Sequence, residues 1–375
     1  MKITCDKLQL QNALGLVIRA VSTRTTMPIL ECILLKANND EGLTLYASDL
    51  EISISTSPMP AEVDESGSIA LNAKLLSEIV KKMTGDFITI ETDDKFNATI
   101  KSGNSRLKIV GQLADEFPAI PENELNNEAN GKYAIKPQTL KDMIRKTIFS
   151  VSVDPSNLVL NGELLEIKEN TLHVVAVDMF RISYRAEKLE NEQSEDGRAV
   201  IPTKALNELS RILPSSDNNV LFYYTDKRAI FETNEFILTS RILEGNFVRY
   251  EQIFNDNFNT MVTCNRLSLL NAFERVILVA MENRMLPITL GVNNNEITIT
   301  ANTERGQADD NVSCEVDGNE LTIYFNPRYF IEALRVIDEE NISLKFNNQL
   351  SPCTIRGIES KVDAKYLIVP LRPPS

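Results

Sequence analysis

The side chains that most often carry out enzyme chemistry are sparse in this chain of 375 residues. The single histidine, His173, lies in the apolar run 172–175. A histidine within a strand is more often structural than catalytic, and one histidine cannot build a histidine-rich metal site. The sequence also contains no Gly-x-x-x-x-Gly-Lys-Ser/Thr phosphate loop and no Gly-x-Ser-x-Gly nucleophile turn.

Cysteines and clustered carboxylates do not suggest a reactive centre either. The five cysteines are scattered and include no Cys-x-x-Cys pair, so we expect neither a disulfide framework nor a zinc site. Paired acids could bind a metal ion or act as acid and base, but at hairpin tips and helix ends a solvated surface is the simpler interpretation. The acidic clusters are Asp93-Asp94, Glu195-Asp196, Asp309-Asp310 and Asp338-Glu339-Glu340. We predict no catalytic residue, no metal and no cofactor; an enzyme with a site in an acidic cleft is the less favoured alternative.

Basic side chains, in contrast, follow a regular pattern. Three segments each carry two cations seven residues apart, and these pairs are Lys74 and Lys81, Lys204 and Arg211, and Arg328 and Arg335. Seven residues are two helical turns, so each pair lies on one face of its helix. Ordinary solvated helix faces would explain one pair, but the repetition favours a function. Around a ring, such faces would line a cationic hole that contacts phosphates without reading sequence.

The bulk charge limits where those cations can act. The net charge is −14 and the pI is about 4.8, which argues against an open nucleic-acid surface. Positive charge must therefore be segregated onto one surface if the protein binds DNA. The first residues form no apolar signal region and no run is long enough to span a bilayer, so we expect a cytoplasmic, nucleoid-associated protein without membrane contact.

The elements that position the cations recur three times. Segments 4–10, 134–140 and 263–269 each read as a strand running into a helix, with one apolar face in the first helix at Leu10, Leu14, Val17 and Val21. Second helices begin near 72–76, 202–206 and 326–330, where Asn72 and Asn326 suit N-caps and Pro202 and Pro327 suit helix starts. Asp49 and Asp178 occupy equivalent places after two strands, which indicates a structural role.

Alternating strands follow each second helix. In the first repeat Ile88 and Ile90 lead to a turn at Asp93-Asp94, after which Phe96, Ala98 and Ile100 alternate. Period-two alternation with polar tips is typical of antiparallel sheet. We therefore predict an α+β chain of three tandem domains, 1–128, 129–252 and 253–375, with a polar linker at 121–132. Since the chain starts and ends on predicted strands, a head-to-tail pair of chains would close the repeat array.

Several short segments, in this order and spacing, resemble a known family over the whole chain. They are Met27-Pro28-Ile29-Leu30, Leu160-Asn161-Gly162, Ala176-Val177-Asp178-Met179-Phe180-Arg181, Asn326-Pro327-Arg328-Tyr329 and Tyr366-Leu367-Ile368-Val369-Pro370-Leu371-Arg372. The chain resembles the beta subunits of bacterial DNA polymerase III, the beta sliding clamps. The resemblance implies three clamp-fold domains, each with two helices and two antiparallel sheets. It also implies a dimeric ring around duplex DNA, which tethers polymerases and has no enzyme activity.

The resemblance also implies binding residues and partners. Arg24, Lys74 and Lys204 match DNA contacts, and the spacing argument adds Lys81, Arg211, Arg328 and Arg335. A hydrophobic pocket for partner peptides would comprise Leu160, Val177, Met179, Phe180, Arg181, Ile182, Val248, Asn326, Tyr329, Leu367, Val369, Leu371 and Arg372. Leu107 and Ile109 would meet Leu278 and Val279 of a second copy, with domain core as the alternative. The implied partners are a second copy, duplex DNA, the polymerase III alpha subunit, the clamp loader delta subunit, and other polymerases and repair proteins that carry clamp-binding peptides.

The chain departs from the family at positions that bear on these sites. Met179-Phe180 stands where Gly-His is usual, and Val248 where proline is usual, so the partner motif could differ. Segment 157–159 lacks the arginine or tyrosines often found there, and residues 373–375 extend past the usual end, near the pocket. An acidic β-rich scaffold that binds only proteins is the alternative function, and it leaves the repeated cations unexplained.

Overall fold

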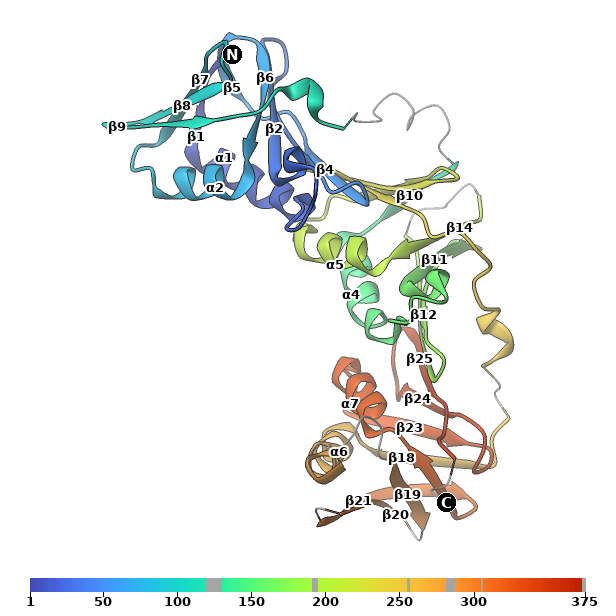
Figure 1. The fold of residues 1–375 in the computed structure, drawn as a ribbon. Helices are drawn as coiled ribbons and strands as arrows, with labels where there is room; N and C mark the ends of the chain where they lie inside the picture. The colour runs from blue at the N-terminus through green and yellow to red at the C-terminus, as the bar shows by residue number, and fades with distance from the viewer. Residues whose placement is uncertain are drawn as a thin grey trace. The chain divides into compact units, whose positions relative to one another are not determined.

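The computed structural model describes residues 1–118, 130–190, 195–254, 257–280, 287–293, 295–304 and 306–372. Its contacts divide the chain into two compact units, and each is taken by itself below. Unit 1 contains residues 1–138 and 204–242, and unit 2 contains residues 139–203 and 243–375. Figure 1 labels the elements of both.

Unit 1 holds two antiparallel sheets and two neighbouring helices, α1 (Lys7–Val17) and α2 (Ala73–Lys82). The smaller sheet has the order β5-β1-β7-β8-β9 and the larger one the order β10-β15-β16-β17-β4-β3-β2-β6. Most of α5 (Thr203–Ile212) also belongs to this unit. The strands are β1 (Lys2–Asp6), β2 (Cys32–Asn38), β3 (Gly42–Ser48), β4 (Ile52–Thr56), β5 (Ala61–Glu65), β6 (Gly67–Asn72), β7 (Phe87–Thr92), β8 (Asn97–Ser102), β9 (Ser105–Val110), β10 (Asn130–Ile135), β15 (Val220–Tyr224), β16 (Arg228–Glu232) and β17 (Phe236–Arg241).

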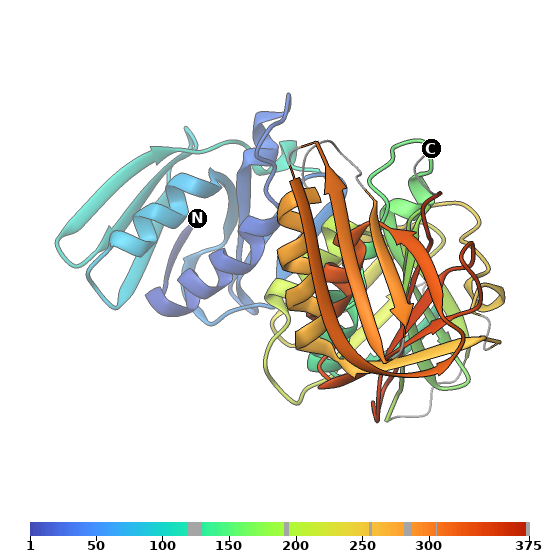
Figure 2. The same ribbon diagram turned by 90° about the horizontal axis from the view of Figure 1, so that it is seen from below.

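Unit 2 is built around one sheet in the order β14-β11-β12-β13-β25-β24-β23-β18-β21-β20-β19-β22. Its helices are α4 (Pro137–Arg145), whose first two residues fall in unit 1, α6 (Arg266–Ala280) and α7 (Pro327–Val336). Figure 2 shows α6 lying along β20 and β21. The strands are β11 (Gly162–Lys168), β12 (Thr171–Val177), β13 (Arg181–Lys188), β14 (Gly197–Pro202), β18 (Thr260–Asn265), β19 (Ile288–Asn293), β20 (Glu296–Thr303), β21 (Gly306–Gly318), β22 (Leu321–Phe325), β23 (Asn341–Phe346), β24 (Cys353–Gly357) and β25 (Asp363–Ile368).

The repeat is visible in how strands of successive repeats join. In unit 1 the last strand of one meander, β17, pairs with β4, and in unit 2 β25 pairs with β13 in the same antiparallel way. Short 3-10 turns precede β2 and β11 at equivalent places, η2 (Pro28–Glu31) and η5 (Leu158–Asn161). The structure therefore contains the three related α+β segments that the sequence predicts.

Local sequence signals explain the helix boundaries. The side chain of Asn72 accepts a hydrogen bond from the Leu75 amide, and that of Asn326 accepts one from the Arg328 amide, so both predicted N-caps are confirmed. Pro327 is the first residue of α7, whereas Pro202 ends β14 directly before α5. The predicted apolar face of α1 is buried at Leu10, Leu14 and Val17, while Val21 lies past the end of the helix.

Two predictions about loops need correction. Phe96 does not alternate with Ala98 and Ile100 in a strand: it lies in the turn before β8 with φ 59, and 41% of its side chain is exposed. Its amide bonds the Asp93 carbonyl, which closes that turn. Lys132, predicted in a linker, lies in β10; residues 119–129 of the linker and the 128/129 boundary lie outside the described residues, as does the 373–375 tail.

Candidate DNA-binding and partner-binding sites

The cation pairs lie on solvent-facing helix surfaces, as their spacing predicts. In α2 Lys74 and Lys81 are exposed, while Leu76 and Val80 on the opposite face have no exposed surface. The same division holds in α5 for Lys204 and Arg211 and in α7 for Arg328 and Arg335. Each helix thus buries an apolar face against its sheet and presents two cations to solvent.

Three of these cations are partly neutralised within the chain. Lys204 Nζ lies 2.5 Å from Asp49 Oδ2 and 2.9 Å from Glu51 Oε2. Burial lowers the pKa of Lys204, but the hydrogen bonds and charges of the two carboxylates outweigh it and raise the pKa above the ordinary value. Arg211 pairs with Glu208 at 2.5 Å, and Arg335 with Glu274 at 2.7 Å.

Four predicted DNA contacts have no such partner in the part of the chain that the structure describes: Arg24, Lys74, Lys81 and Arg328. Lys74 lines a pocket of about 420 Å³ together with Thr23, the neighbour of Arg24 in sequence. Glu31 also lines this pocket, so its wall is not uniformly basic. The structure therefore brings the loop of Arg24 and the start of α2 to one hollow in unit 1.

The predicted peptide pocket is assembled from segments of unit 2 that are far apart in the sequence. Its aliphatic members other than Leu371 share one hydrophobic cluster: Leu160, Val177, Ile182 and Leu367 are buried in it, and Val248 and Val369 pack against it. The Val369 amide bonds the Phe180 carbonyl at 2.8 Å, and the Leu371 amide bonds the Tyr324 carbonyl at 2.7 Å. These bonds hold residues 369–371 between the turn before β13 and strand β22.

Two aromatic rings form the other side of this region. Phe180 and Tyr329 stack with ring centroids 6.3 Å apart and an interplanar angle of 19°. Asn326, which caps α7, is buried, whereas Met179 is 75% exposed and Arg372 is exposed. A cluster of aliphatic side chains near an aromatic pair has the composition that suits an apolar peptide anchor.

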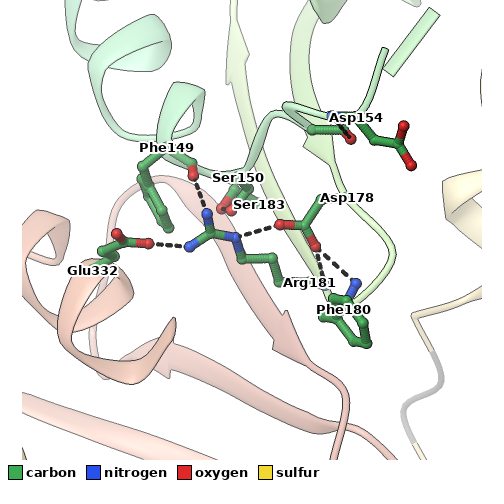
Figure 3. Close-up of polar contacts among 9 residues, drawn as sticks. Phe149, Ser150, Asp154, Asp178, Phe180, Arg181, Ser183 and Glu332 are labelled. Atoms are coloured by element: carbon green, nitrogen blue, oxygen red, sulfur yellow. Dashed lines mark hydrogen bonds and ion pairs between the residues drawn. The ribbon is translucent and has the colours of Figure 1, made fainter. Parts of the chain in front are cut away.

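Arg181 is fully engaged inside unit 2 (Figure 3). Its Nε donates to Asp178 Oδ2 at 2.8 Å, and its terminal nitrogens bond Glu332 and the Phe149 carbonyl. The guanidinium also lies over the Tyr329 ring, 4.6 Å from the centroid. Asp178 Oδ1 in turn accepts the Phe180 and Arg181 amides, so this aspartate shapes the turn that carries Phe180. These contacts hold the Arg181 guanidinium against the Tyr329 ring and beside the turn of Phe180.

A cavity in unit 2, beside Leu367, was not predicted from the sequence. This cavity of about 130 Å³ is lined by Leu367, Ile253, Phe258, Lys345 and Thr354, among others, with Lys345 Nζ 4.4 Å from the Phe258 ring centroid. No periodic pattern could have identified it, because its walls combine the segment before β18 with strands β23, β24 and β25, which lie far from that segment in the sequence.

The predicted dimer residues differ in availability. On the edge strand β9, Leu107 is 39% exposed, but Ile109 is only 9% exposed and pairs with Ala98 across the sheet. Ile109 is therefore domain core in this chain, and the exposed neighbour that the sequence overlooked is Val110 at 77%. In α6, Leu278 is 74% exposed and Val279 is half-buried.

The groups with possible reactivity have structural environments. His173 Nδ1 lies 3.1 Å from the Tyr184 hydroxyl, and burial lowers the pKa of the imidazole. All five cysteines are free thiols. Within the described ranges no three histidine, cysteine or acidic residues gather closely enough to hold a metal ion, and no described helix combines the length and apolar character needed to span a bilayer.

Comparison with known proteins identifies the family to which the chain belongs. Domains of the DNA polymerase III beta subunit family match the chain in order: the N-terminal domain at residues 1–121, the central domain at 134–248 and the C-terminal domain at 251–372. The chain belongs to the DNA polymerase III beta subunit family. The beta sliding clamp of Bacillus subtilis is 32% identical over 99% of this chain and 100% of its own, and that of Halalkalibacterium halodurans is 34% identical over 94% and 95%.

Solved structures of the family agree with the fold. The DNA polymerase sliding clamp of Bacillus subtilis superposes with a TM-score of 0.93 at 30% identity, covering all of both chains. The DNA polymerase III beta subunit of Pseudomonas aeruginosa gives 0.92 at 26% identity over the same coverage. Membership in the beta subunit family confirms the predicted three clamp domains and the prediction of a non-catalytic sliding clamp.

Proposed function

We propose that two copies of this chain close head to tail into a ring that encircles duplex DNA and tethers polymerases to it. The repeated cation pairs carry this proposal. In a chain with a net charge of −14, the second helix of every repeat still presents two cations to solvent. In the proposed ring these helices line the hole, and the negative charge faces outward.

The DNA contact would be weak and independent of sequence. Long, exposed lysine and arginine side chains contact phosphates and read no base edges. At Lys204, Arg211 and Arg335 a phosphate must compete with a carboxylate that is already in place. Such competition keeps each contact weak, which permits sliding.

The dimer would join one edge of unit 1 to unit 2 of the partner chain. Strand β9 is the last strand of its sheet, with exposed Leu107 and Val110 beside the exposed cations Arg106 and Lys108. In unit 2, α6 exposes Leu278, and the neighbouring strand β21 carries the exposed Asp309, while Asp310 pairs with Arg275 of α6. An apolar strand edge with cations is complementary to an apolar helix face beside an exposed acid.

Partner peptides would insert into the pocket of unit 2. Buried aliphatic residues and the Phe180–Tyr329 pair supply apolar contact, and Arg181 orients that pair rather than binding a partner carboxylate. The partners would be the polymerase III alpha subunit, the clamp loader delta subunit, and other polymerases and repair proteins with clamp-binding peptides. We place the domains at 1–128, 129–252 and 253–375 and the protein in the cytoplasm at the nucleoid.

Charge reversal separates this function from an acidic scaffold without DNA contact. The triple variant Lys74→Glu, Lys204→Glu and Arg328→Glu should lose retention on nicked circular DNA, measured by gel filtration after loading by a clamp-loading ATPase. The matched control reverses three other exposed lysines, Lys36, Lys227 and Lys361, and should be retained like the parent. Equal retention of both variants would favour the scaffold.

A further inference from the structure

Two cysteines face one another across neighbouring strands of the third repeat. Cys264 in β18 is the direct cross-strand partner of Cys314 in β21. Side chains of directly opposed residues emerge on the same face of a sheet. Cys264 is 4% exposed and Cys314 is half-buried, and both contribute to the core cluster of this repeat. The two thiols therefore lie side by side.

The hydrogen-bond pattern fixes the type of this pair. The Cys314 amide bonds the Asn295 carbonyl, on the side of the strand away from β18. Cys264 and Cys314 thus cannot exchange backbone hydrogen bonds, and they form a non-hydrogen-bonded antiparallel pair. In such pairs the Cα atoms are about 4.5 Å apart, within the range of about 4.4–6.8 Å that a disulfide spans.

We propose that Cys264 and Cys314 are a thiol–disulfide site that an oxidant closes without unfolding the protein. The closed bond would staple β18 to β21 and tie together the ends of a segment that contains α6, β19 and β20. Chain segments closed into a loop have fewer unfolded conformations, so the oxidised third repeat should resist unfolding more than the reduced one.

The chemistry balances with a low-molecular-weight disulfide as oxidant. The Cys314 thiolate attacks one sulfur of the oxidant, forming a mixed disulfide and releasing one thiolate. The Cys264 thiolate then attacks the Cys314 sulfur, forming the protein disulfide and releasing the second thiolate. The two protons of the protein thiols end on the two released thiols, so the protein is oxidised by two electrons and the oxidant is reduced by two.

Burial makes this reaction slow at neutral pH. It raises the pKa of Cys314 to about 11 and that of Cys264 to about 12. Because only the thiolate attacks, the rate should increase about tenfold per pH unit between pH 7 and 9. The half-buried Cys314 is the accessible first nucleophile.

The chain itself offers matched controls. Cys353 lies on β24, and β23 separates that strand from β18, so Cys264 and Cys353 are at least about two strand spacings, roughly 9–10 Å, apart and cannot be bridged. In the first repeat, Cys5 occupies the place of Cys264, and its cross-strand partner is Ala61. Alanine is therefore a natural residue at the position of Cys314.

The test incubates the native protein with oxidised glutathione at pH 8.5 and then alkylates the remaining thiols. We expect the count of free thiols to fall from the five of the reduced protein to three, with a peptide map that joins Cys264 to Cys314. The Cys314→Ala variant should keep all of its remaining thiols free. The Cys264→Ser variant should stop at a glutathione adduct on Cys314. The Ala61→Cys variant should form a second disulfide, between residue 61 and Cys5. The inference is overturned if the native thiols all stay free or if the mapped bond joins another pair. It is also overturned if, in a urea series, oxidation begins only at concentrations that unfold the third repeat.

Discussion

A buried carboxyl group in the central repeat gives a sharp prediction about stability. Glu163 has no exposed surface, and burial raises the pKa of its carboxyl well above the ordinary value of 4.5. Its partner Thr147 lies 2.5 Å from Glu163 Oε1 and 2.8 Å from the Met143 carbonyl. The Thr147 hydroxyl is the donor to Glu163 Oε1, and its single proton is shared with the Met143 carbonyl. Glu163 Oε2 has no partner among the described residues.

The other repeats show which residues belong at these places. Ile33 in β2 and Ile288 in β19 occupy the place that Glu163 has in β11, and neither has any exposed surface. Ten residues into the first-helix segment, where the central repeat has Thr147, the other repeats have Val17 and Val276, both buried. We therefore expect the double variant Thr147→Val with Glu163→Ile to fold and to be more stable than the parent at neutral pH.

The magnitude follows from proton linkage. An acid whose folded-state pKa is raised contributes stability below its unfolded pKa and loses it as the pH rises towards the folded pKa. Each pH unit in that window costs about 1.4 kcal/mol, so at pH 7.5, three units above 4.5, the parent is disadvantaged by at most about 4 kcal/mol. The advantage of the double variant should reach about 1–4 kcal/mol at pH 7.5 and shrink to less than about 1 kcal/mol at pH 4.5.

Urea unfolding from pH 4.5 to 8, combined with native-state hydrogen exchange of peptides covering β11, would measure this difference. Thr147→Val alone should destabilise the central repeat by about 1–3 kcal/mol, because it removes the one side-chain hydrogen bond that the described residues make to this buried acid. Glu163→Ile alone should stabilise it, since Thr147 keeps its bond to the Met143 carbonyl. A stability difference that does not change with pH, or a double variant less stable than the parent throughout, would refute the reasoning.

Three further predictions concern the proposed interfaces. Arg181→Gln should lower the free energy of unfolding by about 2 kcal/mol in urea titrations, because it leaves Glu332 without its partner. The same variant should bind a fluorescent clamp-binding peptide more weakly, and an unchanged affinity would contradict a positioning role. Glu51→Gln should raise the salt concentration at which the ring dissociates from circular DNA, because Lys204 loses a competing carboxylate. The effect should stay below about 1 kcal/mol since Lys204 is half exposed, and release at a lower salt concentration would contradict the prediction. Leu107→Asp should shift sedimentation from dimer towards monomer, whereas an unshifted dimer would remove β9 from the interface.

Periodicity and spacing were sufficient for most of the fold. Apolar spacing places the helix faces, and the asparagines before α2 and α7 are the caps that they were predicted to be. The turn at Phe96 was not predicted, because the alternation of apolar residues alone does not show where a strand begins. The sequence left Ile109 open between domain core and interface, because periodicity separates the two faces of a strand but does not show which face a neighbouring element covers.

The candidate sites were predictable as sets of residues but not as charge networks. The sequence places Lys204 on an exposed helix face, but its ion pairs with Asp49 and Glu51 join segments far apart in the chain. The same holds for Arg181, whose bond to Glu332 links β13 to α7. Pairings of this kind depend on tertiary contacts that neither composition nor local pattern contains.

The central claim is that the protein holds DNA by topology, and linearisation tests it most directly. The ring would be loaded on a nicked plasmid, freed of loader and unbound protein by gel filtration, and then treated with a restriction enzyme that cuts the plasmid once. The account predicts that the protein co-elutes with the circle at moderate salt and separates from the DNA after the cut. Retention on the linear product, or no retention on the circle, would contradict it.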